Sequence, residues 1–428
     1  MNTSIIGLIC IGAMLVLIVL RAPIALTMAL VGFVGFGWIT AFDPALSILA
    51  SGPFESLSNY SFSPIPMFIL MGVFASKAGM SKELFQGARS IFGSWRGGMA
   101  LAALTSCGIF SAISGSSLAT AASMSRVALP EMEKNGYAPT LATGVLAGGG
   151  TLGIMIPPSI ALLLYALITE QSVGDMFIAG IIPGLLGLVM YGLTVTVLVT
   201  LFPHIAQPGK ATTFKEKILG LKGLIPFTGV FLFIIGGIYT GWFTPTEASA
   251  VGAGATLVIA LSRGMQFSQF KEAISETLAM SAMIFFMVIG AEIFGYFLSV
   301  SRISFSLVEF VDSLHLSPYM ILLSVLVLFM LLGCIMDSIA MLLLVVPVVY
   351  PLINSAGFDP IWFGVVAVIT VELGLITPPV GMNVFVIKSV APHISIRDMY
   401  KGVIPFVISD LARLALIIAF PALAVCLI

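Results

Sequence analysis

The sequence predicts an all-α polytopic membrane protein that contains an inverted repeat, two re-entrant hairpins and two broken transmembrane helices. Three observations predict this fold: a very hydrophobic composition, two apolar stretches interrupted by glycine and proline, and a similarity between the two halves of the chain. Of the 428 residues, 59% are hydrophobic and only 9% are charged. Soluble domains carry about 25% charged residues, so we expect a multi-pass protein embedded in a lipid bilayer.

The composition also excludes several classes of function. A net charge of −1 makes nucleic acid an unsuitable partner. The four cysteines and three histidines lie far apart, in no spacing that would bind a metal ion or form a disulfide framework. The chain contains neither an HExxH motif nor a credible nucleophile–base pair, so we do not expect an enzyme.

The first half begins with three apolar runs that we predict to span the membrane. They are Ile5–Leu20, Ile24–Phe42 and Pro64–Ala78. Arg21 follows the first run and no basic residue precedes it, so we expect a retained span and not a signal peptide. Basic residues mark the cytoplasmic side. Residues 43–63 contain no Lys or Arg and are predicted to be an outer loop, whereas residues 77–96 are predicted to be an amphipathic arm at the cytoplasmic surface.

A re-entrant hairpin and the first broken span come next. The apolar run Met99–Phe110 leads to the polar tip Ser111–Ser117, and a second short run ends at Glu131–Asn135. About a dozen helical residues cover only ~18 Å of the ~30 Å hydrocarbon core, so these runs are predicted to enter from the cytoplasm and turn back. The following span, Thr140–Ile168, contains GGGTLGIMIPPS at 148–159. Its three successive glycines and two prolines are expected to interrupt the helix.

The second half repeats this order of elements. Further spans and a second amphipathic arm are predicted at 176–201, 223–239, 247–261, 275–299 and 303–314. Two short runs, Tyr319–Leu332 and Ile339–Tyr350, flank the tip Gly333–Ser338 and predict the second hairpin. The second broken span, Trp362–Ser389, contains ELGLITPPVG at 372–381, and a last helix is predicted from Val403 onward.

The two broken spans are copies of one segment. A shift of 221 residues places all four prolines between 130 and 158 on prolines, namely Pro351, Pro360, Pro378 and Pro379. The first copy runs from the basic turn at Lys134 to a base-free loop at 170–175, whereas the second runs from base-free residues 354–360 to Lys388. The copies therefore point in opposite directions. Inverted repeats with broken helices near the midplane are typical of secondary transporters that use alternating access.

Four motifs together resemble the large membrane subunit (DctM-like, or M subunit) of tripartite ATP-independent periplasmic (TRAP) transporters. They are AISGSSLAT (112–120), GGGTLGIMIPPS (148–159), GGIYTGWFTPTEA (236–248) and GLITPPVGMN (374–383). The resemblance covers essentially the whole chain. It implies an elevator-type, ion transporter superfamily-like protein of the bacterial inner membrane that takes up an organic acid together with sodium ions. It favours sialic acid, with a C4-dicarboxylate close behind.

The same resemblance implies two protein partners, a separate small (Q-type) membrane subunit and a periplasmic substrate-binding protein. A second hypothesis stays open, in which the chain is a stand-alone ion antiporter or carboxylate symporter of the same fold that works without a binding protein. Neighbouring genes for a four-helix membrane protein and a secreted binding protein would favour the first hypothesis.

Sodium is a hard cation, and helix breaks and serine-rich tips supply the carbonyl and hydroxyl oxygens that such ions accept. We predict a first sodium site formed by Ser114, Ser116, Gly153, Ile156 and Pro158. The repeat carries this set to a second predicted site formed by Ile335, Asp337, Gly374, Thr377 and Pro379. The alternative is that these small residues only pack helices together, and that Asp337 only reaches interfacial water.

Three polar residues near the breaks are candidates for contact with the substrate: Ser117, Arg126 and Asn383. The Arg126 guanidinium could bind a carboxylate with two nitrogens, or it could extend to the cytoplasmic interface. Asn383 could donate to the substrate or make a packing hydrogen bond. Glu372, just before the second break, could contact an ion or cap the half-helix.

The order of elements, interpreted through the resemblance, predicts a mobile transport domain and a scaffold. The scaffold would comprise residues 1–96, with the first arm, and residues 176–315, with the second arm. The transport domain would comprise residues 97–175 and 316–402, each with one hairpin and one broken helix. Residues 403–428 would form a C-terminal helix, on which Asp410 and Arg413 are expected to form a structural ion pair.

Overall fold

The structure is a computed structural model that describes residues 3–207 and 214–428, and every regular element within these ranges is helical. Residues 208–213, part of the predicted scaffold segment 176–315, lie outside the described residues. The first half contains α1 (Thr3–Val19), α2 (Ile24–Ile39), α3 (Phe42–Ser58), η1 (Tyr60–Phe62), α4 (Pro64–Lys77), α5 (Met80–Phe92), α6 (Gly98–Ser114), α7 (Ser117–Lys134), α8 (Pro139–Met155), α9 (Ile160–Ile168) and α10 (Val173–Leu201).

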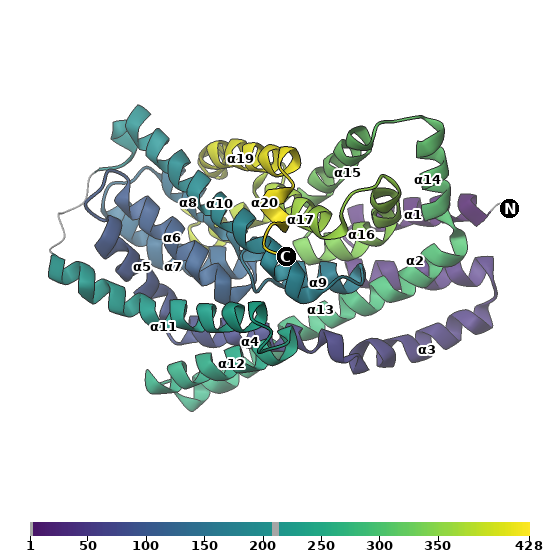
Figure 1. Cartoon of the computed structure of the whole chain (residues 1–428), viewed down its shortest axis with the longest axis horizontal. Helices are drawn as coiled ribbons and strands as arrows, with labels where there is room; N and C mark the ends of the chain where they lie inside the picture. Colours follow the sequence, from purple (N-terminus) through teal and green to yellow (C-terminus); the bar gives the residue numbers. More distant parts are fainter. Residues whose placement is uncertain (1–2, 208–213) are drawn as a thin grey trace.

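The second half follows the same plan. It contains η2 (Pro203–Ile205), α11 (Phe214–Tyr239), α12 (Pro245–Ser262), α13 (Phe267–Ser301), α14 (Ile303–Ser313), α15 (Pro318–Gly333), α16 (Ser338–Ser355), α17 (Pro360–Ile376), α18 (Met382–Val390), α19 (Ile396–Ala419) and α20 (Ala422–Val425). Figure 1 shows an elongated body in which α1–α3 lie at one end, α5–α8 lie at the other, and the long α13 runs obliquely through the body.

Six helical segments of the described chain are long and apolar enough to cross a bilayer, with α8 and α9 counted as one. The α3–α4 pair, bent by 57°, would be a seventh, and five further apolar helices are shorter. Large apolar side chains such as Leu8, Leu193 and Val258 are exposed on the outer helices. A lipid environment accounts for this exposure, and the prediction of an all-helical multi-pass fold is confirmed.

The predicted outer loop at 43–63 is wrong, because most of it is the helix α3. Both of its mid-helix serines have hydrogen-bond partners: the Ser47 hydroxyl donates to the Asp43 carbonyl (3.3 Å), and the Ser56 hydroxyl lies 2.9 Å from the Gly52 carbonyl oxygen and also contacts the Glu292 carboxylate of α13. The packing of α3 against α2 and α13 stabilises this helix.

Both hairpins are present, but their arms are longer than the predicted dozen residues. The arms α6 and α7 have 17 and 18 residues, and α15 and α16 have 16 and 18. At 1.5 Å per residue each arm is about 25 Å long, still somewhat short of the hydrocarbon core. Ser111 belongs to the helix and not to the tip, because its hydroxyl donates to the carbonyl of Cys107 (2.6 Å).

The glycine run 148–150 does not break the first broken span. All three glycines are helical within α8, and the interruption is confined to residues 156–159, around Pro157 and Pro158. The glycines instead allow close packing: a Cβ atom on Gly149 would lie 2.9 Å from Cys107, and one on Gly150 would lie 2.8 Å from the Ala121 side chain. Tertiary contacts offset the conformational cost of glycine in a helix, as is common in membrane interfaces.

The last long helix starts earlier than predicted, at Ile396 and not at Val403. The Ser395 hydroxyl accepts a hydrogen bond from the Asp398 backbone N–H (3.1 Å) and caps the helix. Ser172 and Asp175 make the same cap at the start of α10. The predicted boundary between residues 402 and 403 therefore falls inside α19.

The bounds of the helices show the repeat directly. Helix α7 begins and ends 221 residues before α16, and α8 begins and ends 221 residues before α17. The breaks match as well: one follows the end of α8 and the other the end of α17, and each contains a cis peptide bond between its two prolines. The two halves thus share one backbone design.

Two contacts show that the broken spans are antiparallel. Near the end of the first, the Tyr165 hydroxyl donates to the carbonyl of Pro360, the first residue of the second (2.7 Å). At the opposite end, Glu133, which precedes the first span, lies 2.7 Å from the imidazole of His393, which follows the second. The start of each span therefore meets the end of the other, and the predicted inversion is confirmed.

The two halves are also interleaved outside the broken spans, because α2 packs along α13 and α4 packs along α12. Glycines permit the closest approach. A Cβ atom on Gly32 of α2 would lie 2.8 Å from the backbone of Ile293, and one on Gly290 of α13 would lie 2.4 Å from the Ala25 carbonyl oxygen. These contacts are between backbones, so no side-chain rotation could relieve them.

We predict that Gly290→Ala destabilises the protein, because a methyl group there would push α13 away from α2. Overpacking of this kind costs about 1–3 kcal/mol. Gly295→Ala on the same helix is the matched control: no atom lies within 4 Å of its Cβ position, and alanine improves helix propensity by up to about 1 kcal/mol. Thermal unfolding in detergent should show a lower transition for Gly290→Ala only. Equal shifts for the two variants would contradict this packing.

Candidate functional site

The first hairpin tip contacts the first helix break. A Cβ atom on Gly153 would lie 2.5 Å from the Ser116 carbonyl oxygen, so the glycine allows α8 to touch the tip. The Ile160 N–H, the first of α9, donates to the Gly115 carbonyl (3.4 Å), and a Cβ atom on Gly115 would lie 3.0 Å from the Pro158 carbonyl oxygen. The structure therefore brings tip and break together.

Hydroxyl groups gather at this contact. The Ser114 hydroxyl lies 2.7 Å from the Thr120 hydroxyl and 3.5 Å from the Ser116 carbonyl oxygen. The Ser116 hydroxyl accepts from the Ala119 N–H (3.4 Å) and caps α7. The Ile156 side chain faces away, towards α10, where a Cβ atom on Gly184 would lie 2.9 Å from it. Ile156 could therefore contribute to the predicted first sodium site through its main chain and not through its side chain.

The second hairpin tip contacts the second break in the same way. Gly333 at the tip and Gly374 in α17 touch through their backbones, since a Cβ atom on Gly374 would lie 2.6 Å from the Gly333 backbone. The Gly381 N–H donates to the Cys334 carbonyl (3.4 Å). Asp337 occupies the position of Ser116 in the repeat, and its carboxylate caps α16 by accepting from the Ile339 N–H (3.2 Å).

The second site differs from the first in its side chains. Ile335, which matches Ser114, has no hydroxyl group and its side chain is 55% exposed. The Thr377 hydroxyl donates to the Leu373 carbonyl (2.5 Å). The Tyr400 hydroxyl lies 2.8 Å from the Pro379 carbonyl oxygen and 2.7 Å from that of Val380, so its one hydrogen is available to either main-chain oxygen of this break.

Two of the three candidate substrate residues meet between the repeats. The Ser117 hydroxyl lies 2.9 Å from Oδ1 and 2.7 Å from Nδ2 of Asn383, and Asn383 also donates to the Ala147 carbonyl (3.1 Å). Both side chains are buried. Ser117 is the first residue of α7 and Asn383 the second of α18, so two helix N-termini converge here.

Arg126 lies apart from this pair. It is exposed on α7, nine residues beyond Ser117 and therefore roughly 13 Å further along the helix axis. The structure does not bring it to the other predicted residues, and its contact with substrate stays a prediction.

Glu372 pairs with an arginine of the last long helix. Its carboxylate forms an ion pair with Arg413, and Arg413 Nη2 also lies 2.9 Å from Asp410 Oδ1. All three side chains are completely buried. The expected Asp410–Arg413 pair is therefore part of a larger network that joins α17 to α19.

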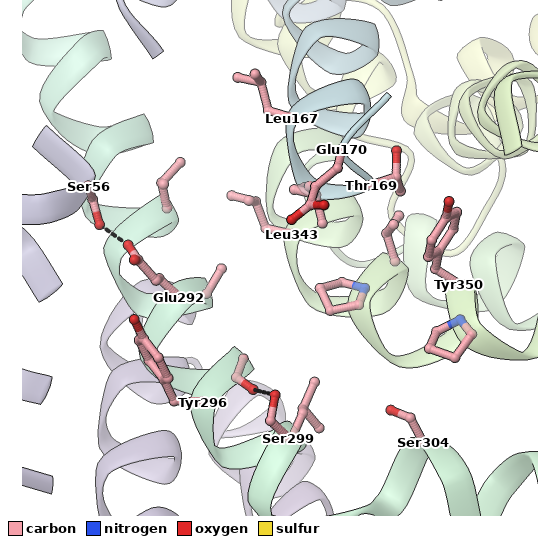
Figure 2. A pocket seen from close by; sticks show the side chains of 18 of the residues that line it. Ser56, Leu167, Thr169, Glu170, Glu292, Tyr296, Ser299, Ser304, Leu343 and Tyr350 are labelled. Atoms are coloured by element: carbon pink, nitrogen blue, oxygen red, sulfur yellow. Dashed lines mark hydrogen bonds between the residues drawn. The ribbon is translucent and has the colours of Figure 1, made fainter. Parts of the chain in front are cut away.

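A large cavity lies outside both tip–break contacts. It has a volume of about 780 Å³ and is lined by α3, the end of α9, α13, α14 and α16. Figure 2 shows Glu170 and Tyr350 on one side of it and Glu292, which accepts a hydrogen bond from Ser56, on the other. Its lining includes three carboxylates, from Glu55, Glu170 and Glu292, and none of the described lining residues is basic. The negative lining disfavours an anionic ligand there.

The sequence analysis did not identify Thr120 and Tyr400 as parts of these sites, nor Glu372 as a partner of Arg413. The motif AISGSSLAT did contain Thr120, one turn into the helix that follows the tip. Arg413 was visible as a cation within an otherwise apolar helix, a pattern that signals a buried partner in membrane proteins. Nothing local in the sequence points to Tyr400, which is a long-range partner.

The described residues contain no group of three or more His, Cys, Asp or Glu side chains that could hold a metal ion.

Comparison with known proteins identifies a family. Residues 11–423 match the model of the tripartite ATP-independent periplasmic transporter, DctM component. The large permease protein of a C4-dicarboxylate TRAP transporter from Pseudomonas aeruginosa is 35% identical over 92% of this chain and 93% of its own length. The large permease protein of a sialic acid TRAP transporter from Vibrio cholerae is 30% identical over 85% of each chain.

A solved structure shares the fold. The YdaH transporter of Alcanivorax borkumensis superposes with a TM-score of 0.63 over 89% of this chain and 90% of its own, at 14% sequence identity. At this identity the similarity concerns the fold alone.

We predict that Ser117 and Asn383 are energetically coupled. Removal of one partner leaves the other buried without its hydrogen bond, which costs about 1–3 kcal/mol. In a double-mutant cycle with Ser117→Ala and Asn383→Ala, the double variant should be more stable than the sum of the two single losses predicts, by about 1 kcal/mol. Thermal unfolding in detergent measures this cycle, and strictly additive losses would contradict the contact.

Proposed function

This chain belongs to the DctM component family of tripartite ATP-independent periplasmic transporters, and we propose that it couples the inward flow of sodium ions to the uptake of an organic acid. As a member of this family it is the large permease of a carboxylate-uptake transporter and not an enzyme.

The arrangement of helix ends at the first tip supports sodium binding. Helices α6 and α8 both end there, at Ser114 and Met155, and helix C-termini carry partial negative charge. The adjacent hydroxyls and the unwound carbonyls at 156–158 are hard oxygen donors. We propose that Ser114, Ser116 and the carbonyls of Gly153, Ile156 and Pro158 bind one sodium ion.

A second sodium ion would occupy the matching place in the second repeat. The proposed ligands are the carbonyls of Ile335, Gly374, Thr377 and Pro379 and the carboxylate of Asp337. Because Asp337 carries a charge where the first repeat has Ser116, this site would hold its ion by stronger electrostatic attraction.

The substrate carboxylate would bind where α7 and α18 begin. The N–H groups at helix N-termini favour anions, and the Ser117–Asn383 pair adds a hydroxyl and an amide that can donate to carboxylate oxygens. Binding would exchange the hydrogen bonds within this pair for bonds to the substrate. We retain Arg126 as a second candidate contact, at the cytoplasmic end of the path.

The two-part arrangement supports an elevator motion. Residues 97–175 and 316–402 would form the transport domain, with α19 continuing it beyond residue 402, and residues 1–96 and 176–315 would form the scaffold. The acidic cavity lies between helices of these two parts, with α9 and α16 on one side and α3, α13 and α14 on the other.

The proposed substrate is a C4-dicarboxylate or sialic acid. The relative named for C4-dicarboxylates is 35% identical to the chain, and the relative named for sialic acid is 30% identical. C4-dicarboxylates are therefore the first substrates to assay. The proposed setting is the bacterial inner membrane, with a small membrane subunit and a periplasmic binding protein as partners.

We predict that replacement of sodium by potassium abolishes substrate uptake by the reconstituted complex. Ser114→Ala should raise the sodium concentration for half-maximal uptake roughly ten-fold, the effect of about 1.4 kcal/mol of lost binding free energy. Ser106→Ala is the matched control, since Ser106 is a buried serine on the same helix whose hydroxyl donates only to the Ala102 carbonyl (2.6 Å). Unchanged uptake in potassium would contradict sodium coupling.

The need for a binding protein separates the two hypotheses carried from the sequence. If the chain works as the permease of a tripartite system, uptake into proteoliposomes requires the small subunit and the loaded binding protein. Uptake by this chain alone, at the rate of the full complex, would instead support a stand-alone carrier. Competition by unlabelled C4-dicarboxylate or sialic acid in the same assay identifies the substrate.

A further inference from the structure

A continuous series of side-chain contacts joins the two broken spans through α10 and α19. It begins in α8, where the Thr151 hydroxyl lies 3.2 Å from the Tyr191 hydroxyl of α10. Tyr191 donates to the Asp410 carboxylate of α19. Arg413 Nη2 lies 2.9 Å from Asp410 Oδ1, and the same nitrogen pairs with the Glu372 carboxylate of α17. We call these five residues the polar bridge.

Every residue of the polar bridge is buried, with a solvent exposure of 0%. In a buried setting, hydrogen bonds and ion pairs are stronger than in water, and the loss of one partner leaves the other polar group without compensation. The four helices α8, α10, α17 and α19 are therefore held at fixed separations where the bridge passes between them.

The two ends of the bridge lie at equivalent positions beside the breaks. Thr151 lies two residues before Gly153, whose backbone contacts the first hairpin tip, and Glu372 lies two residues before Gly374, whose backbone contacts the second. The 221-residue shift places Thr151 on Glu372. The bridge thus connects the last turn of α8 to the last turn of α17, and each of these turns carries proposed sodium ligands.

The contact between Thr151 and Tyr191 has two arrangements. Tyr191 uses its one hydrogen to donate to Asp410, so it can only accept a hydrogen bond from Thr151. The Thr151 hydroxyl also lies 2.7 Å from the carbonyl oxygen of Gly148 in its own helix. Rotation of this hydroxyl hydrogen exchanges the two acceptors, and only one arrangement closes the bridge. The bridge therefore contains a two-state element next to the first break.

The close packing of α10 keeps Tyr191 beside the breaks. A Cβ atom on Gly184 would lie 2.9 Å from the Ile156 side chain, and one on Gly187 would lie 2.1 Å from Arg413 Nη1. A sliding boundary cannot pass between surfaces in such contact. In the proposed elevator motion, α10 would therefore move with the broken spans and not with the rest of the segment 176–315.

We propose that Tyr191 is a positioning residue that couples the two sodium sites, because it holds the last turns of α8 and α17 in one relative position. This inference rests on the proposed function. An ion at the first site fixes the last turn of α8, and the bridge then holds the last turn of α17 in the arrangement that accepts the second ion. The second ion therefore meets a smaller ordering cost, and the coupling is equal in both directions.

Equilibrium binding of radioactive sodium to the purified full-length protein tests this coupling, with choline replacing sodium to keep the ionic strength constant. Binding to two sites gives a Hill coefficient above about 1 only if the sites are positively coupled, and its upper limit is about 2. The wild type should lie between these values. Tyr191→Phe removes the bridging hydroxyl and should lower the coefficient to about 1.

Tyr137→Phe is the matched control. Tyr137 is a buried tyrosine whose hydroxyl accepts from the Met99 N–H (3.1 Å), a contact within the first repeat. This variant also loses a buried hydrogen bond but leaves the bridge intact, so it should keep the wild-type Hill coefficient. A purely structural role of Tyr191 would lower the melting temperature and leave the coefficient unchanged.

A second pair of variants tests the bridge if Tyr191→Phe does not fold. Thr151→Val keeps the branched shape and removes the hydroxyl, so the Hill coefficient should fall to about 1. Thr151→Ser keeps the hydroxyl and should retain the wild-type coefficient.

The inference is overturned if both Tyr191→Phe and Thr151→Val keep the wild-type coefficient. It is also overturned if the wild type binds two sodium ions with a coefficient of about 1, a result that leaves the proposed function intact. Saturation with one sodium ion, or no sodium binding, would overturn the proposed pair of sodium sites together with this inference.

Discussion

Unwound main chain inside a membrane must find its hydrogen-bond partners within the protein, and this constraint organises the whole structure. Each break exposes carbonyl and N–H groups that a straight helix would pair internally. The hairpin tips supply the partners: Gly115 accepts from Ile160, and Cys334 accepts from Gly381. Tyr400 donates to the second break. A hairpin tip that pairs with a break is therefore required by the fold itself, whether or not it binds an ion.

The repeat doubles this arrangement but does not make its two copies chemically equal. Helices α7 and α8 have the same bounds as α16 and α17 under the 221-residue shift, and yet Ser116 is replaced by Asp337 and Thr151 by Glu372. The first copy is thus neutral where the second is ionisable. The two ionisable residues of the second copy lie in different places. Asp337 lies at the proposed sodium site, whereas Glu372 pairs with Arg413 in the buried network and not with the tip. In the proposed pair of sodium sites, this asymmetry would give the second site the higher affinity.

The elements that could be predicted from the sequence are those that depend on residues close to one another in the chain. Proline breaks a helix through its own ring and missing N–H, so both breaks, both hairpins and the inverted order were accessible from residue types and charge bias. The role of a glycine depends on what lies beside it, and so the run 148–150 was misread as a break when it is a packing surface against Cys107 and Ala121. Helix α3 and the Glu372–Arg413 pair were missed for the same reason, since their stability comes from partners distant in sequence.

The central claim is that the two broken spans cross the membrane in opposite directions. The direct measurement is labelling of single cysteines with an impermeant thiol reagent, from either side of the membrane, in a protein whose exposed Cys426 is replaced by Ser. The account predicts that Lys134→Cys and Pro392→Cys are labelled only from the cytoplasmic side, and Glu170→Cys and Ser355→Cys only from the opposite side. Labelling of Lys134→Cys and Pro392→Cys from opposite sides would contradict it.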